Sequence, residues 1–581
     1  MRAWPAMKYG RPELAAALGD CRLAFAAVIA FSALMNVLTL TGAIFMLQVY
    51  DRVVPSRSIA TLVGLSLIAL VLYLALGLFD HLRARILIRV GAYFGTVVEP
   101  RVFRAVVGEP LKSGLSGDGM QPLRDLDHIR QFLSGSGPGA FADLPFLPLQ
   151  VLICFLIHPL IGGATLAGAA LIFLLTLATD RSVRRLTLVA SETASQRAAL
   201  LAASRRNAEA MRALGMHGRM GARWAAINRT LEEAQATMLD RSTGFAGASR
   251  IFRMLFQSAV LALGAFLVIE QEASFGVIIA ASILSARALQ PIEQVVANWR
   301  GFVAARQGWG RLSAALARFP EPARPMALPA PRARLEVERL AVAPPGATRA
   351  TVADVTFQLA AGSGLGIIGP SGAGKSSLAR AIIGAWAPAS GRVRLDGADL
   401  DQWNADELGR HVGYLPQDVE LFSGTIADNI ARFQPDADAD AIVAAARTAG
   451  VHDMILRLPG GYSAEIGEGG STLSAGQRQR IGLARALYGQ PFLVVLDEPY
   501  SNLDAEGDAA LTQAILAVRL RGGIVLIVAH RPAALEGVDQ VLTLLNGTVA
   551  AFGPKDEVLR KVLRPVAPAI KEAASAEARR A

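Results

Sequence analysis

Six long apolar stretches dominate the first half of the chain, and charged segments separate them. They cover residues 23–47, 61–79, 144–157, 161–179, 254–269 and 275–289. A helix needs about 20 apolar residues to cross a bilayer, and the first two stretches come closest to this requirement. Three stretches are shorter or contain Gln150, Gln257 or Arg287, so a buried helix of a soluble protein is their alternative. The pattern predicts six membrane-spanning helices before residue 290.

From about residue 335 the pattern changes to short apolar runs separated by polar segments. The runs 365–368, 411–416, 492–496 and 524–529 resemble buried strands, and residues 377–383 begin a helix. Residues 320–332 contain five prolines, which is typical of a linker. We therefore predict an N-terminal segment at 1–20, a membrane domain at 21–318, a linker at 319–334, an α/β domain at 335–563 and a tail at 564–581.

The distribution of charge orients the six spans. Residues 181–253 contain thirteen arginines and residues 80–142 contain eight basic residues, whereas residues 270–272 read Glu-Gln-Glu. Basic residues favour the cytoplasmic side, so both long segments and both termini are predicted to be cytoplasmic, with Arg52 and Arg57 as exceptions. This accounts for the net charge of +10 without a nucleic-acid partner. Binding of an acidic partner by the basic residues stays open.

The long cytoplasmic segments are predicted to extend the spans as helices, because residues 180–253 are rich in Ala, Arg, Leu and Glu. Residues 124–133 and 207–224 are candidate contacts with the C-terminal domain, and ordinary exposed helical hairpins are the alternative. Cys21 and Cys154 do not have the spacing of a metal or disulfide site, and we expect both to be packing residues.

The clearest chemical motif is GPSGAGKS at residues 369–376. It fits the phosphate-binding loop, in which a glycine and four free positions precede Gly-Lys-Ser. Small residues let backbone amides surround a polyphosphate, Lys375 brings a positive charge to the β- and γ-phosphates, and the Ser376 hydroxyl reaches Mg²⁺. The loop lies between a predicted strand and a predicted helix, whose N-terminus favours a bound anion.

Further polar elements follow this loop in order. They are Gln417, LSAGQ at residues 473–477, the pair Asp497 and Glu498, SNLD at residues 501–504, and His530. Taken alone, an acidic residue or a histidine at a strand end has an ordinary structural explanation. The ordered set resembles the nucleotide-binding domain of ATP-binding-cassette (ABC) proteins, which are ATPases.

The resemblance implies a role for each of these residues. The residues expected to bind ATP are Gly369, Ser371, Gly372, Ala373, Gly374, Lys375, Ser376 and Ser377, together with Ser474, Gly476 and Gln477 of the signature element. The residues expected to hold Mg²⁺ are Ser376, Gln417 and Asp497. The catalytic set is Glu498 as the base that polarises the attacking water, His530 at the γ-phosphate, and Gln417 at the metal or the water.

In the same resemblance, the signature element of one copy closes over the nucleotide bound to another. A homodimer with two composite ATP sites is therefore expected. Two departures from the family pattern occur. Ala475 replaces the commoner glycine of the signature, and residues 341–346 (AVAPPG) lack the aromatic residue on which many such domains stack adenine. The adenine contact is therefore unassigned.

Other motifs narrow the resemblance to exporters. LFSGTIADNI at residues 421–430, with GEGG at 467–470 just before the signature, resembles exporter domains rather than importer ATPases. Four more motifs resemble the type I protein secretion ATPases of Gram-negative bacteria, in the branch that exports metalloproteases and repeat-in-toxin proteins. They are MLQVYDRVVPSRS at 46–58, DLPF at 143–146, ALQPIE at 288–293 and APPG at 343–346.

This resemblance covers residues from about 20 to 560. It implies an α-helical six-span ABC exporter membrane domain followed by an α/β P-loop ABC nucleotide-binding domain. The protein is expected in the bacterial inner membrane, in contact with lipid, with its nucleotide-binding domain in the cytoplasm. The implied partners are an inner-membrane adaptor (membrane fusion protein), an outer-membrane channel and an unfolded secreted protein with an uncleaved C-terminal signal.

Three other functions each agree with part of the sequence. A lipid or drug exporter has the same architecture, and Asn36 and Gln257 are the polar candidates for its pocket. A soluble ABC ATPase of DNA repair or translation agrees with the high isoelectric point but not with the first two apolar stretches. A purely structural membrane protein conflicts with the intact catalytic set. The residues do not identify the cargo or the surface that recognises it.

Overall fold

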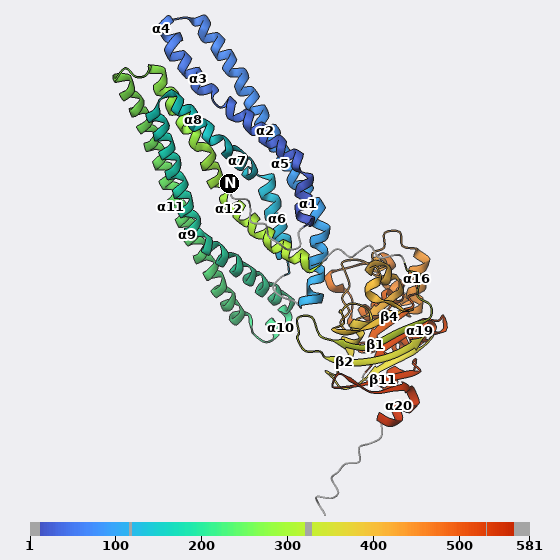
Figure 1. Ribbon diagram of the computed structural model, residues 1–581. Coiled ribbons are helices and arrows are strands. Elements are labelled where there is room, and N and C mark those ends of the chain that lie inside the picture. The colour runs from blue at the N-terminus through green and yellow to red at the C-terminus, as the bar shows by residue number, and fades with distance from the viewer. Residues whose placement is uncertain (1–11, 115–118, 320–327, 530–531, 563–581) are drawn as a thin grey trace, which may run out of the picture. The chain divides into compact units, whose positions relative to one another are not determined.

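The computed structural model describes residues 12–114, 119–319, 328–529 and 532–562 (Figure 1). The chain divides into two compact units. Met1–Pro110 and Leu115–Glu321 form the first, and Leu111–Gly114 and Pro322–Ala581 form the second. In its described residues the first unit is helical, whereas the second combines strands with shorter helices.

Six helical segments among the described residues are long and apolar enough to cross a membrane. The first combines α2 (Arg22–Leu38), α3 (Thr41–Gln48), a π-helical turn (Val49–Val53) and α4 (Val54–Ser56), and the others are α5 (Ile59–Ser113), α7 (Gly137–Asp143) with α8 (Leu147–Ile157), α9 (Pro159–Arg206), α11 (His217–Ile269) and α12 (Phe275–Arg318). Shorter helices are α1 (Pro12–Asp20), α6 (Gln121–Ser134) and α10 (Ala208–Ala213).

The outer surfaces of these helices carry large apolar side chains. Only 6% of the most apolar window of α5 is buried. The three stretches for which a soluble helix was the alternative also expose such side chains, because Leu156 of α8, Leu255 of α11 and Phe275 of α12 are each at least 65% exposed. A surface of this kind is stable in lipid rather than in water. The prediction of six spans is therefore confirmed.

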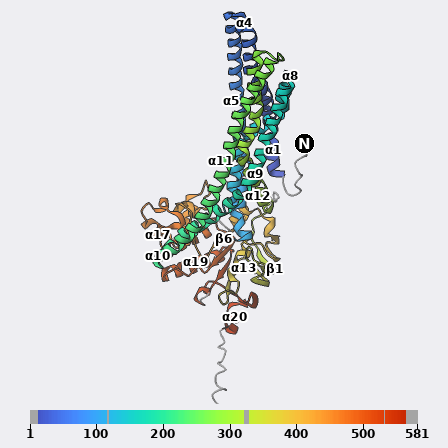
Figure 2. The same cartoon turned by 90° about the vertical axis from the view of Figure 1, so that its left-hand side faces the viewer.

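The helices α9 and α11 continue far beyond the apolar stretches and lie side by side (Figures 1 and 2). This confirms the helical prediction for residues 180–253. Residues 207–224 cover α10 and the start of α11, where most side chains are exposed. Residues 124–133 belong to α6, whose Leu126, Ile129 and Leu133 are buried in a core shared with α5 and α12. Their contact with the nucleotide-binding unit stays a prediction.

The motif at residues 46–58 forms the turn between the first two spans. Its π-helical part contains Asp51, which accepts hydrogen bonds from Ser274 Oγ at 2.7 Å and from the Gly276 backbone N–H at 2.9 Å. A Cβ at Gly276 would lie 2.7 Å from Asp51 Oδ1, so a larger residue would displace the Asp51 carboxylate from this position. Asp51 therefore links the turn between the first two spans to the beginning of α12. It accepts a hydrogen bond from one of the backbone amides at that helix N-terminus that have no partner within the helix.

The second unit contains two larger sheets and one short pair of strands. The strands are β1 (Arg334–Val342), β2 (Val352–Ala360), β3 (Gly364–Ile368), β4 (Ser390–Leu395), β5 (Ala398–Asp399), β6 (Val412–Leu415), β7 (Gly424–Thr425), β8 (Glu465–Ile466), β9 (Leu493–Asp497), β10 (Ile524–Val528), β11 (Gln540–Leu545) and β12 (Thr548–Pro554). The orders are β2-β1-β4-β5, β12-β11-β3-β10-β9-β6 and β7-β8. The predicted strand runs correspond to β3, β6, β9 and β10.

Helices surround these sheets within the unit. They are α13 (Lys375–Ile382), α14 (Ala405–His411), α15 (Ile426–Ile430), α16 (Ala439–Thr448), α17 (His452–Arg457), α18 (Ala475–Leu487), α19 (Ala505–Leu520) and α20 (Lys555–Val562). Short 3-10 turns cover Leu400–Gln402, Gly461–Ser463, Glu468–Gly470 and Pro532–Leu535. The helix predicted from residue 377 begins two residues earlier, at Lys375.

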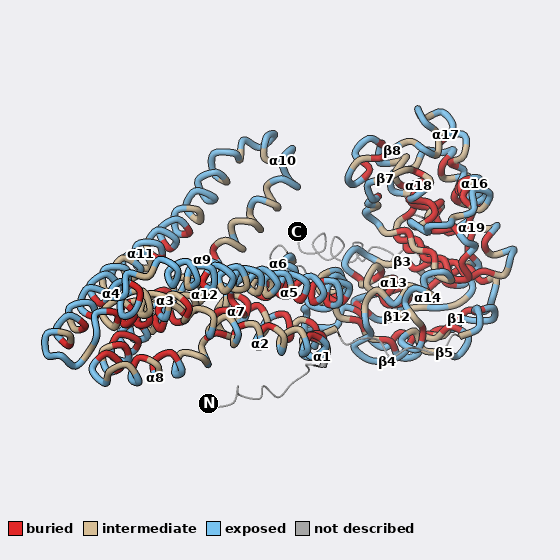
Figure 3. Tube along the Cα trace, turned by 90° about the horizontal axis from the view of Figure 1, so that it is seen from above, coloured by how far each residue is buried: buried red, intermediate tan, exposed pale blue. Residues whose placement is uncertain are grey.

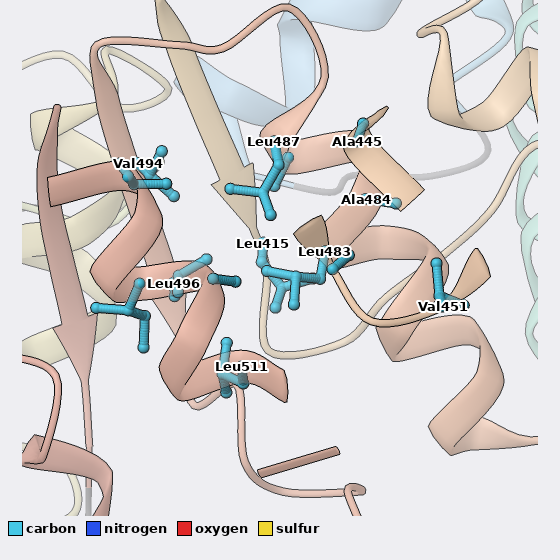
Figure 4. Packing of buried hydrophobic residues seen from close by; sticks show 14 of the residues in the cluster. Leu415, Ala445, Val451, Leu483, Ala484, Leu487, Val494, Leu496 and Leu511 are labelled. Atoms are coloured by element: carbon cyan, nitrogen blue, oxygen red, sulfur yellow. The ribbon is translucent and has the colours of Figure 1, made fainter. Parts of the chain in front are cut away.

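The central strands β9 and β10 are buried along their whole length, and buried segments gather in the interior of this unit around β3 (Figure 3). Successive side chains of a strand point to opposite faces, so β9 contributes to two hydrophobic cores. Val494 and Leu496 pack in one core with Leu415, Leu483 and Leu511 (Figure 4). The intervening side chains of β9 pack in the other core. Continuous apolar runs are expected in parallel strands covered on both faces.

One buried ion pair joins α6 to α12 in the first unit. The Asp125 side chain is 1% exposed, and the partly exposed Arg311 donates to it from Nε at 2.9 Å and from Nη2. Gln121 Nε2 donates to the same carboxylate at 3.0 Å. The helices approach closely here, because a Cβ at Gly308 would lie 3.1 Å from the Asp125 carbonyl oxygen. The Asp125–Arg311 ion pair therefore stabilises the contact between α6 and α12 at the place where the two helices approach closely.

We expect Arg311→Ala to lower the free energy of unfolding by about 3 kcal/mol, because it leaves a buried carboxylate without its cation. The matched control is Asp127→Ala on the same helix, whose pair with Arg130 is 53% exposed on both sides. This control should cost less than about 1 kcal/mol. Thermal unfolding of the detergent-solubilised protein measures both. Equal losses for the two variants would contradict the role assigned to Asp125 and Arg311.

Candidate nucleotide-binding site

The predicted phosphate-binding loop connects the end of β3 to the first turn of α13. Gly374 stands at the N-cap position in the left-handed region, with φ +95°. A Cβ there would lie 2.6 Å from Val352 Cγ2 and 2.8 Å from the Thr351 carbonyl oxygen. Glycine is therefore required both by the backbone conformation and by the close approach of β2. The free amides at the beginning of α13 provide an anion-binding end.

Lys375 folds back over this loop and is 5% exposed. Its Nζ donates to the carbonyl oxygens of Gly369 at 2.9 Å and Pro370 at 3.0 Å. Burial lowers the pKa of Lys375, while the negative charges of Glu498 and Asp497 act in the opposite direction. The side chain thus places a cation inside the loop, where the phosphates of a nucleotide would need it.

Asp497 ends β9 and has no exposed surface. Its Oδ1 accepts a hydrogen bond from Ser376 Oγ at 3.1 Å, and its Oδ2 is buried without a partner among the described residues. Burial raises the pKa of Asp497, whereas the hydrogen bond from Ser376 lowers it. A buried carboxylate oxygen without a donor, beside a serine hydroxyl, fits a hard divalent cation such as Mg²⁺.

Glu498 follows directly, with a left-handed φ of +51°. Its backbone N–H donates to the Val528 carbonyl oxygen at 3.1 Å, and its Oε2 accepts a hydrogen bond from Gln417 Nε2 at 3.2 Å. Strain of this kind is typical of functional positions. Gln417, which follows the neighbouring strand β6, thus orients the Glu498 carboxylate.

The order of the parallel strands explains why these residues meet. The strands β6, β9, β10 and β3 are neighbours, and their carboxyl ends lie at one edge of the sheet. Gln417 follows β6, Asp497 and Glu498 stand at the end of β9, and the loop follows β3. Ligands bind at such an edge in α/β sheets. His530 follows β10 in the sequence but lies outside the described residues.

The signature element forms the N-terminus of α18. Ser474 is the N-cap and makes a capping box with Gln477, in which Ser474 N–H donates to Gln477 Oε1 at 2.9 Å and Gln477 N–H donates to Ser474 Oγ at 3.3 Å. A Cβ at Gly476 would lie 2.8 Å from the Asn502 carbonyl oxygen. In the described part of one copy, no hydrogen bond joins Ser474 or Gln477 to the phosphate-binding loop.

Sequence reasoning missed Gln479, which is 3% exposed on α18. Its Nε2 donates to the Pro499 carbonyl oxygen at 2.5 Å, and its Oε1 accepts a hydrogen bond from the Asn502 N–H at 3.2 Å. Gln479 therefore joins the signature helix to the segment that follows Glu498. The signal was a glutamine two residues after the signature, but its partners lie about twenty residues further along the chain.

Comparisons with known proteins agree with this geometry. Residues 352–501 match the ABC transporter family, and residues 25–292 match the ABC transporter transmembrane region. The chain is 56% identical to the type I secretion system ATP-binding protein PrsD of Rhizobium meliloti, over 95% of both chains. The chain belongs to the ABC transporters, in the group of type I secretion ATP-binding proteins.

Two further relatives of this ABC transporter are named for secretion or translocation. It is 30% identical to the cyclolysin secretion/processing ATP-binding protein CyaB of Bordetella pertussis, over 92% of this chain and 75% of the relative. It is 28% identical to the toxin RTX-I translocation ATP-binding protein of Actinobacillus pleuropneumoniae, over 93% and 76%. A bacterial Atm1-family ABC exporter with ATP bound has the same fold, with TM-score 0.80, 24% identity and coverage of 97% and 98%.

These comparisons confirm several expectations drawn from the sequence. The protein is an ATPase with an ABC exporter membrane domain followed by an ABC nucleotide-binding domain. It is a multi-pass protein of the bacterial inner membrane, and its nucleotide-binding domain is cytoplasmic. The roles of the individual site residues stay predictions.

We expect Gly374→Ala to destabilise the nucleotide-free protein more than Gly372→Ala. Both residues have positive φ, so both substitutions cost about 1 kcal/mol of backbone strain. A Cβ at Gly372 meets nothing within 4 Å, whereas at Gly374 it meets Val352 and Thr351. Thermal unfolding without nucleotide measures the difference. Similar melting temperatures for the two variants would show that the approach of β2 does not constrain the loop.

Proposed function

We propose that this transporter exports an unfolded polypeptide across the inner membrane as the permease/ATPase of a type I secretion system. The observation that carries this proposal is the match along nearly the whole chain to secretion ATP-binding proteins, at up to 56% identity. Relatives that matched only the ATPase domain would support nucleotide hydrolysis alone. A match that includes the six spans supports a shared transported substrate class.

Each site residue is proposed to have its own role in ATP hydrolysis. Lys375 and the loop amides would bind the phosphates, and Ser376 and Asp497 would hold Mg²⁺ with Gln417. Mg²⁺ when bound neutralises phosphate charge. The Glu498 carboxylate would accept a hydrogen bond from the attacking water and then take up a proton from that water. Gln417 supports this role, since its Nε2 donates to Glu498 Oε2 at 3.2 Å and orients the carboxylate.

The active form proposed is a homodimer with two composite sites. Ser474 caps α18 with an exposed side chain and bonds to Gln477 rather than to the loop of its own copy. We therefore expect Ser474, Gly476 and Gln477 to bind the nucleotide held by a second copy. The N-terminus of α18 favours a bound phosphate. The further partners proposed are an inner-membrane adaptor, an outer-membrane channel and a secreted protein with an uncleaved C-terminal signal.

One observation favours the alternative, export of an amphipathic small molecule such as a lipid or drug. A cavity of about 530 Å³ lies between α9, α11 and α12. Apolar residues such as Ile172 and Phe245 line it together with basic ones such as Arg184 and Arg250. The relatives matched over the whole chain are named for secretion of proteins, so protein export is the main proposal.

The composite site predicts a specific pattern in mixed dimers. In a dimer of a Lys375→Ala copy and a Ser474→Arg copy, head-to-tail geometry leaves one site intact, so we expect about half of the normal ATP turnover. When one copy carries both substitutions and the other is wild type, both sites are damaged and turnover should be lost. Two affinity tags allow each mixed dimer to be purified and assayed. The reverse pattern would mean that Ser474 acts within its own copy.

Protein export is tested in the host strain from which this chain has been deleted. We expect at least one protein to disappear from the medium and to return with the wild-type chain but not with Glu498→Gln. The purified Glu498→Gln variant should bind ATP and turn over at least about 100-fold more slowly, because the general base is lost. A reporter that carries the C-terminal segment of the missing protein should then be secreted. An unchanged set of secreted proteins would remove the proposal and favour the small-molecule alternative.

A further inference from the structure

A cavity of about 380 Å³ in the membrane domain is lined by residues of α2, α5, α7, α8 and α12. Ten of its fourteen lining residues have polar side chains, among them Asn36, Asp80, Arg83, Asp143, Gln150 and Arg287, and Gln290 and Gln294 of α12 are two more. Polar and ionisable groups are costly within a bilayer and are found there chiefly on substrate pathways. Sequence reasoning named Asn36 alone of this set as a polar candidate.

One side of the cavity is a closed hydrogen-bond network. Arg83 Nη1 donates to both carboxylate oxygens of Asp143 at 3.0 Å and to Ser32 Oγ at 3.0 Å. Asn36 Nδ2 donates to Asp143 Oδ1 at 3.3 Å, and Gln150 Nε2 donates to Asn36 Oδ1 at 2.8 Å. This network joins α2, α5, α7 and α8.

The lining also contains amide groups that this network does not pair. Gln150 is 5% exposed, and its Oε1 has no partner among the described residues. Across the cavity, Gln290 Oε1 accepts from Arg287 Nη1 at 2.9 Å. No hydrogen bond joins the side chain of Gln290 or Gln294 to the network in the described part of the chain. A buried amide oxygen without a donor favours a ligand that brings a donor.

The charges and amide groups of the lining indicate which class of ligand the cavity can bind. Asp80 and Asp143 balance Arg83 and Arg287, so the lining has no net charge and does not favour an ionic headgroup. Glutamine amides present both a donor and an acceptor, as a peptide group does. An unfolded chain within the membrane needs a partner for every peptide N–H and C=O. From residue 287 to residue 294, α12 rises about 10 Å, the length of about three extended residues.

We propose that this cavity binds the peptide backbone of the exported polypeptide, with Gln150, Gln290 and Gln294 as hydrogen-bonding partners. The inference rests on the proposed function and deepens it, because it assigns a site in the membrane domain at which the substrate is held. Recognition of backbone rather than side chains allows segments of different sequence to pass. The C-terminal signal is then needed for entry and not for passage through this cavity.

The test uses the secreted reporter with a tightly folded domain added, so that it stalls during export. The reporter carries one cysteine in its stalled segment, and the transporter carries Gln290→Cys. Cys21 and Cys154 are buried, so the parent chain serves as background. The matched control is Gln257→Cys, an exposed glutamine of α11 outside the cavity lining. Oxidation should give about tenfold more disulfide-linked product with Gln290→Cys than with Gln257→Cys.

A second position and a second readout keep the outcome clear. Gln294→Cys repeats the test, and secretion of the unstalled reporter shows which variants are folded. Gln290→Leu should slow secretion about fivefold, through loss of one hydrogen bond, and Gln290→Asn should restore most of the rate. Secretion-competent cysteine variants at both positions without cross-links would overturn the cavity assignment and leave protein export intact. Failure of the wild type to export the reporter would remove the proposed function and this inference together.

Discussion

Every polar group that this protein removes from water needs a partner in the chain or in a ligand, and this constraint accounts for most of its internal order. In the membrane domain, Arg311 reaches the buried Asp125, and Arg83 reaches Asp143. In the nucleotide-binding unit, Lys375 is buried against two carbonyl oxygens of its own loop. Six buried side-chain oxygens have no hydrogen-bond partner among the described residues. Two of them, Asp497 Oδ2 and Gln150 Oε1, lie where a ligand is proposed.

The two domains satisfy the constraint with different architectures. Helices pair their own backbone groups and can expose apolar side chains such as Leu74 and Val71 to lipid. The nucleotide-binding unit instead buries parallel strands on both faces, and their carboxyl ends bring polar side chains to one edge. The cost of burying Asp497 is met in part by Ser376, and the remaining oxygen fits the cation that accompanies ATP. The groups that stabilise this buried carboxylate are therefore the same groups that are proposed to hold the cation.

The proposed export cycle joins these features. ATP would bring two copies together, since Ser474 of each signature element is exposed and bonds to Gln477 of its own copy. A nucleotide that binds the closed dimer more tightly than the open one shifts that equilibrium, and hydrolysis reverses it. The long helices α9 and α11 are suited to carry such movement along the membrane domain. A neutral cavity lined by amides is suited to hold an unfolded chain through its backbone between these steps.

Much of this protein could be predicted from the sequence because the decisive signals are local. The apolar stretches, the loop at residues 369–376 and the acidic pair after β9 depend on neighbouring residues and on a period of two or 3.6. The contacts of Gln479 with Pro499, of Asp51 with Gly276 and of Gln150 with Asn36 could not be predicted in this way. Each joins residues at least twenty positions apart, on elements whose facing sides are decided only by packing. The sequence by itself determined the six spans, the nucleotide loop and the order of the candidate catalytic residues. The tertiary structure alone decided which polar groups meet, because their cost of burial depends on neighbours that are distant in the chain.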